Sequence, residues 1–462
     1  MSMFESWLFG HSILIFSYSL AIAGVAHMLR HRRSPGGTMA WLVTFVALPL
    51  AGTALYLVFG GRKLRQARRA ASIRFREDQS VPRGLMDDFS QSLCTYGTAP
   101  VTGGNKVTIC DNGVSGYQHL MELIDRAQNR ICLATFIFAR DSLGEAVLEK
   151  LAHKARNGVD VRVLVDGLGS LRTHHRFFHE FIACGGKFAV FQPVVDFPFR
   201  THTNLRNHRK ILVADGRISF AGGMNLTQED IYPETTGAGW QDLSLVIEGP
   251  AAEHLETVFR GDWRFATGDV EIDLPSEHLS TRAGSQLVQI LPAGPDVPND
   301  PIYSVSVTAI YRASQRIWIV TPYFVPNDAL VEALMFASQR GVDVRILVPR
   351  RSNHLLSDLA AASLLRDIQG AGGTVLRYLK GMVHAKAMLV DQEFAAVGSA
   401  NFDMRSLFLN YEVMQVCYSP AAIESVSQYF LKLAANCESG PSRSGFWREM
   451  GEGTIRALSP LF

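Results

Sequence analysis

Two segments of the chain, residues 208–225 and 384–401, repeat one set of polar residues at identical spacing. They read HRKILVADGRISFAGGMN and HAKAMLVDQEFAAVGSAN and align without a gap. Residues two apart on an extended chain share a face, so the histidine and lysine of each copy point together. An imidazole beside an ammonium can transfer a proton or attack an electrophile while an anion is held. The aligned residues are His208 and His384, Lys210 and Lys386, Asp215 and Asp391, and Asn225 and Asn401.

Two interpretations of this repetition are open. A fold duplication that kept the motif only for packing explains the apolar positions, but it explains the polar ones poorly because burying them without partners is costly. Alternatively, the two copies meet and pool their histidines, lysines and asparagines. Such a pocket has many cations and donors and few carboxylates, which suits a phosphate diester. The asparagines follow glycine-containing turns, where backbone and amide donors can approach an oxyanion.

The motif aspartates belong to the repeated pattern but are expected to serve it structurally. Asp215 and Asp391 each come seven residues after their histidine. This odd offset turns them away from the His/Lys face of a regular strand. We therefore expect them to pair with backbone groups or with a nearby base.

The repeat extends well beyond the motif. ARNGVDVRVLVD (155–166) matches SQRGVDVRILVP (338–349), and AQNRICLATFIFARD (127–141) resembles residues 313–328. Each copy runs in one order: an apolar strand, a helix, a strand opened by GVDVR, a helix ending at Gly-Gly, and the His/Lys strand. Helices that alternate with β-branched runs predict an α/β unit with a covered sheet. The first copy has an extra loop segment with Phe188, Phe191, Phe197 and Phe199, which either contacts lipid or packs under the loop.

The first sixty residues are strongly apolar. No Asp, Glu, Lys or Arg occurs between Glu5 and Arg30 or between Arg33 and Arg62. Each gap is long enough for a helix to cross a hydrocarbon core of about 30 Å. We predict membrane helices near residues 7–29 and 38–60, in preference to a signal peptide or a buried hairpin, with Pro49 tolerated inside the second.

The charges beside these spans predict their orientation. Three arginines connect the spans, and seven basic residues follow the second, so the positive-inside rule places the rest of the chain in the cytoplasm. The seven also either attract an anionic membrane surface or merely set the topology. They are Arg62, Lys63, Arg65, Arg68, Arg69, Arg74 and Arg76.

Composition fits a protein of several domains. The chain has 462 residues, 47% of them hydrophobic, and a formal net charge of +2, which is too small to indicate nucleic-acid binding by the whole chain. Its six cysteines are scattered, which favours free thiols over disulfides or a zinc site. We predict a hairpin at 1–62, a basic linker at 63–105, and two homologous domains at 106–285 and 286–462.

The motif H-x-K-x4-D-x6-G-[GS]-x-N, present twice, resembles the phospholipase D superfamily. The wider chain is similar to the bacterial cardiolipin synthases of that superfamily, in the segments NLRNHRKILVADGRISFAGGMNL, GWQDLSLVIEGP, TPYFVPND and MVHAKAMLVDQEFAAVGSANFDMRSLFLNYEV. The resemblance implies two pseudo-symmetric α/β sandwich domains that share one active site. It also implies a phosphatidyltransferase that uses phosphatidylglycerol as donor and acceptor in the cell inner membrane, without metal or cofactor.

The resemblance further implies a role for each residue. His208 is expected to attack phosphorus, and His384 to act as acid and then base. Glu412 is expected to orient His384, and Asp242 to orient His208. A phospholipase D-type hydrolase, a related phosphatidyltransferase and a membrane scaffold with a vestigial site stay as alternatives, whereas the membrane hairpin argues against a nuclease. The groups expected to bind the phosphate oxygens are Lys210, Lys386, Asn225, Asn401 and Ser399, with Gly223 in place of the serine in the first copy.

Overall fold

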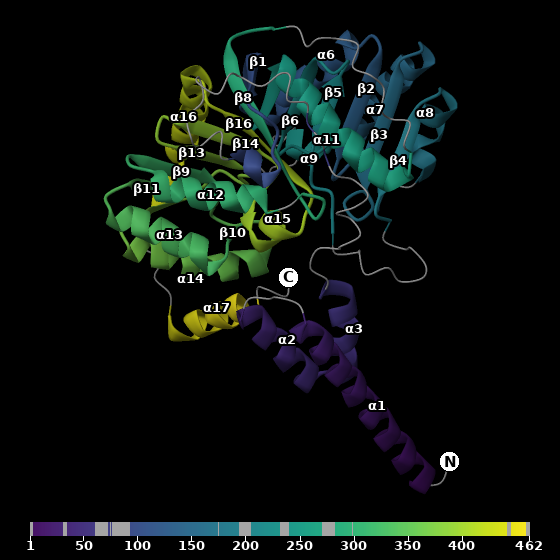
Figure 1. Ribbon diagram of the computed structural model, residues 1–462, viewed down its shortest axis with the longest axis vertical. Helices are drawn as coiled ribbons and strands as arrows, with labels where there is room; N and C mark the ends of the chain where they lie inside the picture. Colours follow the sequence, from purple (N-terminus) through teal and green to yellow (C-terminus); the bar gives the residue numbers. More distant parts are fainter. Residues whose placement is uncertain are drawn as a thin grey trace.

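The computed structural model describes residues 3–30, 35–60, 73, 75, 93–173, 175–193, 205–231, 240–269, 282–297, 299–440 and 445–458. An α/β body holds most of these residues, and the N-terminal helices project from one side of it (Figure 1). Of the basic segment 62–76, only residues 73 and 75 are described. The predicted basic residues there therefore lie outside the described residues. The predicted domain boundaries stay predictions.

The apolar N-terminal region forms three helices, α1 (Met3–Leu29), α2 (Pro35–Ala47) and α3 (Pro49–Phe59). Within the described part of the chain, one helical stretch, His11–Leu29, is long and apolar enough to cross a membrane. The prediction of one continuous second span was wrong, because the chain leaves helical geometry at Leu48 (φ −138°, ψ 69°). Pro49, which has no N–H to donate, begins α3. The aromatic side chains of Trp41, Phe45 and Tyr56 pack together where these helices meet.

The body is built on one long sheet whose two halves mirror each other in strand order. The order is β17-β12-β11-β9-β13-β14-β16-β8-β1-β7-β6-β5-β2-β3-β4 among the described residues, so β8 and β1 form the antiparallel seam. Reading outward from the seam, each half presents equivalent strands. The first-half strands are β1 (Thr102–Cys110), β2 (Arg130–Thr135), β3 (Asp160–Asp166), β4 (Lys187–Phe191), β5 (Ile211–Ala214), β6 (Ile218–Gly222) and β7 (Ser244–Glu248).

The second half repeats these strands and adds short ones. Strand β17 extends its outer edge, and β10 pairs with β15 in a separate ladder. These strands are β8 (Gln286–Ala293), β9 (Arg316–Val320), β10 (Phe324–Val325), β11 (Asp343–Pro349), β12 (Thr374–Tyr378), β13 (Ala387–Val390), β14 (Phe394–Gly398), β15 (Phe402–Asp403), β16 (Glu412–Cys417) and β17 (Cys437–Ser439).

Helices complete the layers of each half. The first half has α6 (Gly113–Arg126), α7 (Ser142–Arg156), α8 (His179–Ala183), α9 (Gln228–Ile231) and α11 (Pro250–Thr267). The second half has α12 (Pro301–Arg312), α13 (Asp328–Gln339), α14 (Leu355–Gly370), α15 (Met404–Phe408), α16 (Pro420–Ala434) and α17 (Phe446–Leu458). Short 3-10 turns occupy Cys94–Tyr96 and His175–Phe178.

The strands divide their side chains between two cores, as a period of two requires. In β2, Cys132 and Ala134 face a core shared by both halves, whereas Leu133 faces the core under the outer helices α6 and α7. Strand β9 does the same: Trp318 enters the shared core and Ile319 the outer core under α12, α13 and α14. The shared core also takes in α11 and α16. The two halves are therefore packed face to face by hydrophobic burial.

The element order predicted for each copy is confirmed, with one addition. A strand, β4 or β12, lies between each Gly-Gly pair and the His/Lys segment. The first glycine of each pair, Gly185 (φ +93°) or Gly372 (φ +101°), takes the left-handed conformation that ends the preceding helix. Phe191 is fully buried and Phe188 stacks on Phe178, so these two aromatic residues pack internally. Phe197 and Phe199 lie outside the described residues.

Candidate active site

The two His/Lys segments are held in place by backbone bonds between the halves. Each segment is extended and directly precedes a strand, β5 or β13. The His208 N–H donates to the carbonyl of Tyr411 at 2.9 Å, and the His384 N–H donates to the carbonyl of Gln241 at 2.7 Å. Each motif histidine is thus fixed to a segment that leads into a strand of the other half, β16 or β7.

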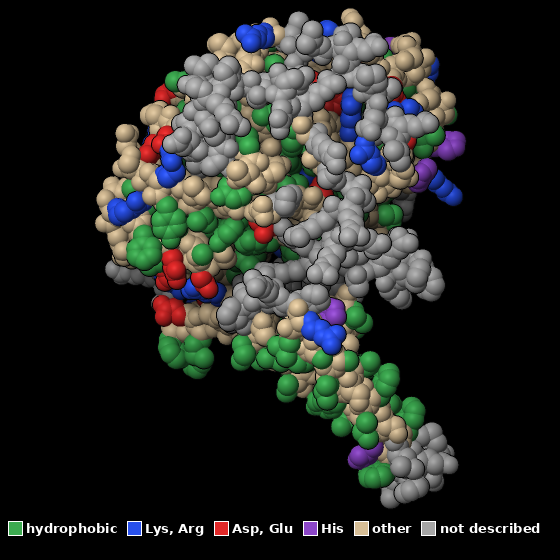
Figure 2. Space-filling view, viewed as in Figure 1, with side chains coloured by type: hydrophobic (Ala, Val, Ile, Leu, Met, Phe, Trp, Pro, Cys, Tyr) green, Lys and Arg blue, Asp and Glu red, His purple; other side chains and the backbone are tan. Residues whose placement is uncertain are grey.

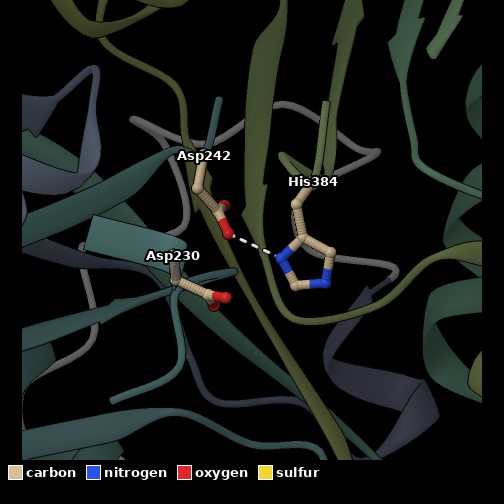
Figure 3. A group of neighbouring side chains, drawn as sticks. All are labelled: Asp230, Asp242 and His384. Carbon is tan, nitrogen blue, oxygen red and sulfur yellow. Dashed lines mark hydrogen bonds and ion pairs between the residues drawn. The ribbon is translucent and has the colours of Figure 1, made fainter. Parts of the chain in front are cut away.

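His384 pairs with a carboxylate of the first half. Its Nδ1 lies 2.7 Å from Oδ2 of Asp242, and both side chains are buried (Figure 3). Burial alone would raise the pKa of Asp242, but the charges of His384 and Lys386 outweigh it and lower that pKa. The Trp240 ring lies 5.2 Å from the imidazole, centroid to centroid. Asp242 therefore orients His384 and favours its protonated form.

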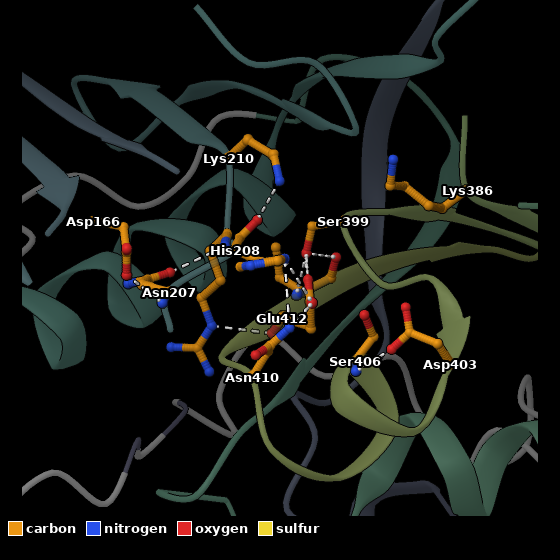
Figure 4. Close-up of polar contacts among 12 residues, drawn as sticks. Asp166, Asn207, His208, Lys210, Lys386, Ser399, Asp403, Ser406, Asn410 and Glu412 are labelled. Carbon is orange, nitrogen blue, oxygen red and sulfur yellow. Dashed lines mark hydrogen bonds and ion pairs between the residues drawn. The ribbon is translucent and has the colours of Figure 1, made fainter. Parts of the chain in front are cut away.

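His208 has a looser carboxylate partner from the second half. Its Nδ1 lies 3.5 Å from Oε1 of Glu412 and 3.5 Å from the amide nitrogen of Asn410 (Figure 4). Burial raises the pKa of Glu412 to about 7. The Ser399 hydroxyl donates to Oε2 of this carboxyl at 2.5 Å. The Phe136 ring packs on His208 at a centroid distance of 4.1 Å.

The predicted partners of the two histidines were therefore exchanged. We expected Glu412 to orient His384 and Asp242 to orient His208, each within one half. The structure pairs them across the halves, because the bridges Asn207 to Tyr411 and Gln241 to Val383 place each carboxylate beside the opposite histidine. One site is thus assembled from both copies of the motif.

The difference between Gly223 and Ser399 follows from these carboxylates. A Cβ atom at Gly223 would lie 2.2 Å from Oδ1 of Asp242, so only glycine leaves room for this carboxylate. At the equivalent position of the second half, Ser399 instead donates a hydrogen bond to Glu412. The half with glycine at this position therefore uses the shorter aspartate, and the half with serine uses the longer glutamate, which accepts the hydrogen bond of the serine.

The motif lysines are buried and point back along their own segments. The Nζ of Lys210 donates to the His208 carbonyl at 2.8 Å, and that of Lys386 donates to the His384 carbonyl. Burial lowers the pKa of both ammonium groups, and that of Lys386 falls to about 7 because Lys210 adds its repulsion. A bound phosphate would supply negative charge and so stabilise the charged form of these buried ammonium groups.

The two asparagines are buried beside these groups. Within the described residues, Oδ1 of Asn225 and Oδ1 of Asn401 have no hydrogen-bond partner. The amide nitrogen of Asn225 donates to Asp230 at 3.0 Å. The free atom of each amide is an acceptor, which cannot donate to a phosphate oxygen, so phosphate binding by these two asparagines stays a prediction.

The two imidazoles experience different electrostatic surroundings. Burial and the charges of Lys210, Arg405 and Lys386 lower the pKa of His208 well below its ordinary value. Burial and Lys386 also lower the pKa of His384, but Asp242 opposes that change. His208 is therefore held neutral, and His384 retains a proton more readily than His208 does.

The motif aspartates lie in turns away from the histidines. Asp215 accepts the backbone N–H groups of residues 128–130, and Asp391 accepts those of residues 314–316, at 2.7–2.8 Å. Both have positive φ (54° and 47°), a conformation that aspartate tolerates better than most residues. They tie the turn after each motif strand to the start of the neighbouring strand, and these contacts favour the structural role that was expected for them.

Two buried groups of the site were not predicted from the sequence. Arg209, between the two motif residues, pairs with Asp262 and donates to the carbonyl of Glu412 at 3.0 Å, so it ties the halves together. Asn410 stands two residues before the recognised Glu412 and gave no signal of its own. Arg209 was missed because the motif was interpreted through His208 and Lys210, which share a face, and Arg209 lies between them.

Asp230 is another carboxylate near His384. One ligand atom from each of Asp230, Asp242 and His384 lies within 4.8 Å of the others (Figure 3). Asp230 already accepts bonds from Asn225 and Thr227, and Asp242 accepts from His384. Asp242 thus orients the imidazole, whereas the bonds of Asp230 hold the turn that carries Asn225 and Thr227.

The sequence of the chain is similar to those of known proteins. The family described as cardiolipin synthase, PLD-like domain, matches residues 120–263 and 307–434, and the phospholipase D-nuclease N-terminal family matches residues 19–61. A cardiolipin synthase of Alkalihalophilus pseudofirmus is 32% identical over 99% of this chain and 95% of its own length. One of Geobacillus sp. (strain WCH70) is 33% identical over 92% of this chain and 87% of its own.

The fold also has a solved relative. Phosphatidylserine synthase of Haemophilus influenzae superposes with a TM-score of 0.59 over 76% of this chain and 95% of its own, at 14% identity, and so supports the architecture alone. Matches over both repeats, the hairpin and nearly the whole length assign the family. The chain belongs to the cardiolipin synthase family of phospholipase D-like proteins.

Proposed function

We propose that the protein is a cardiolipin synthase that joins two phosphatidylglycerol molecules and releases glycerol. The observation that carries this proposal is the crossed pairing of His384 with Asp242 and of His208 with Glu412, which builds one site from two motifs. Two imidazoles with different surroundings suit a double displacement at one phosphorus.

In the first step, His208 attacks the phosphorus of the donor phosphatidylglycerol. Its Nδ1 faces Glu412 and Asn410, so Nε2 is the atom that bonds to phosphorus. The bond between phosphorus and the head-group glycerol oxygen breaks, and His384 gives its proton to that oxygen. The products of this step are free glycerol and a phosphatidyl group on His208.

In the second step, His384 is neutral and accepts a proton from a hydroxyl of the acceptor phosphatidylglycerol. The resulting alkoxide attacks phosphorus, and the bond from phosphorus to His208 breaks. The product is cardiolipin, and both imidazoles regain their starting states. Throughout, Lys210 and Lys386 would stabilise the non-bridging oxygens, with Asn225, Asn401 and Ser399 lining the site.

The attacking group decides between transfer and hydrolysis. Water in the second step would give phosphatidic acid, as in a phospholipase D-type hydrolase, which stays the alternative. The apolar N-terminal helix favours a reaction at a membrane surface, where lipid hydroxyls are concentrated and water is excluded. The relatives named above are cardiolipin synthases, which favours transfer. We further propose a multi-pass inner-membrane anchor with the body in the cytoplasm.

A defined lipid assay tests the proposal. The full chain, purified in detergent, is given phosphatidylglycerol as the sole phospholipid, and lipids and free glycerol are measured. We expect cardiolipin and glycerol in equal amounts, no turnover by His208→Ala or His384→Ala, and no loss of activity with EDTA. Phosphatidic acid without cardiolipin would establish the hydrolase instead, and an EDTA-sensitive reaction would overturn the metal-free mechanism.

A further inference from the structure

The helix α17 packs against the body through its polar side. Glu452 is fully buried and binds Arg366 of α14 at 2.5 Å and Arg448, one turn earlier, at 2.9 Å. Arg456, one turn later, binds Asp367 of α14 at 3.1 Å. Residues spaced by four share one face of a helix, so the face turned toward the protein is an ionic one.

The opposite face of α17 is apolar and exposed. Phe446 is 67% exposed, Trp447 81% and Met450 52%. At about 100° per residue, these three side chains lie across the helix from Arg448, Glu452 and Arg456. An amphipathic helix of a water-soluble domain turns its apolar side to the core. Helix α17 has the reverse orientation, and Figure 2 shows hydrophobic side chains gathered below it.

The position of α17 identifies what covers this face. The helix contacts α2 of the apolar N-terminal region, and Figure 1 places it where that region adjoins the body. The apolar face is thus level with the place where the N-terminal helices leave the body. Exposed aromatic side chains at this level are typical of the membrane interface.

A basic pocket adjoins the start of α17. It has a volume of about 670 Å³, and Arg448 belongs both to it and to the helix. Burial and the repulsion of Arg366 and Arg448 lower the pKa of Arg377, against the attraction of Glu438. Guanidinium groups in excess over carboxylates suit phosphate oxygens. The charged residues that line the pocket are Arg350, Arg351, Arg377, Arg448, Asp358 and Glu438.

We propose that α17 is a membrane-docking helix. Phe446, Trp447 and Met450 enter the interfacial layer of the bilayer beside the N-terminal helices, and the arginine pocket binds phosphates of anionic lipids there. The body is then held against the membrane at two places. This inference rests on the membrane association of the chain and not on the reaction it catalyses.

Fluorescence quenching tests the position of Trp447. The full chain is placed in nanodiscs of phosphatidylcholine with brominated acyl chains and phosphatidylserine. The signal of Trp447 is the difference between the wild type and Trp447→Phe, because the other five tryptophans are common to both. We expect bromine to quench more than half of this difference signal and aqueous iodide to quench little of it. Strong iodide quenching without bromine quenching would overturn the docking.

Further variants separate the contributions to docking. The double variant Phe446→Ser/Met450→Ser keeps Trp447, and its bromine quenching should fall at least twofold. Leu431→Ser, an exposed leucine of α16, is the matched control and should leave the quenching unchanged.

The arginine pocket is tested by lipid composition. Nanodiscs without phosphatidylserine should show weaker quenching for the wild type, and Arg351→Gln/Arg377→Gln should lose this dependence. Quenching by the double variant that still depends on phosphatidylserine would refute the pocket as a lipid phosphate site.

Discussion

Replacing Asp242 with asparagine tests the crossed arrangement of the site. The change keeps the shape of the side chain and removes the charge that lies 2.7 Å from Nδ1 of His384. A hydrogen bond to a charged group contributes about 1.5–3 kcal/mol. At about 1.36 kcal/mol per factor of ten, kcat should fall roughly 10-fold to 150-fold.

The same substitution should also change how kcat depends on pH. His384 must carry a proton to release glycerol, and Asp242 opposes the influences that lower the pKa of His384. Without Asp242 that pKa falls further, so His384 loses its proton at lower pH. The alkaline limb of the kcat profile should therefore move to lower pH, while the acid limb, set by His208, stays in place.

The assay measures glycerol release from phosphatidylglycerol in mixed micelles across the pH range. Asp215→Asn is the matched control, since Asp215 binds backbone amides away from the histidines and its loss should reduce stability without moving either limb. Movement of the acid limb in Asp242→Asn would assign Asp242 to His208 and refute the crossed pairing. An unchanged kcat would show that Asp242 does not position His384.

Three further substitutions probe the carboxylates and their neighbours. Glu412 has a pKa raised by burial from 4.5 to about 7, so between these values the folded state binds more protons than the unfolded state, and stability falls as pH rises. Glu412→Gln removes this loss, so at pH 8 the variant should be more stable than the wild type by up to about 3 kcal/mol and should unfold at a higher temperature. At pH 4 the variant should show no such advantage. Thermal unfolding in detergent measures both differences, and equal differences at the two pH values would contradict the raised pKa. Gly223→Ser should reduce kcat at least tenfold because its Cβ meets Asp242 Oδ1 at 2.2 Å, whereas Ser399→Gly should be milder; a fully active Gly223→Ser would show that this carboxylate can move.

Most of the fold could be predicted because its signals are local. Alternating apolar residues predict strands with two buried faces, and the repeated GVDVR and Gly-Gly segments mark equivalent strands and helix ends in both halves. The break at Leu48 was missed because an apolar composition does not reveal where proline starts a new helix. The outward apolar face of α17 was missed because its ionic partners, Arg366 and Asp367, lie on another helix.

The residues of the candidate site could be predicted from the sequence, but the partners of its histidines could not. Its histidines, lysines and asparagines were visible because they repeat at fixed spacing. The partners of the histidines depend on which segments from the two halves lie side by side, and nothing near Asp242 or Glu412 in the sequence encodes that. The backbone bonds from His208 to Tyr411 and from His384 to Gln241 hold these segments side by side in the folded chain.

Capturing the covalent intermediate distinguishes the roles of the two histidines. The full chain is mixed with phosphatidylglycerol, stopped within one turnover by denaturant at alkaline pH, and its peptides are analysed by mass spectrometry. We expect a phosphatidyl group on His208 and none on His384. A phosphatidyl group on His384, or cardiolipin formed with no adduct on either histidine, would contradict this expectation.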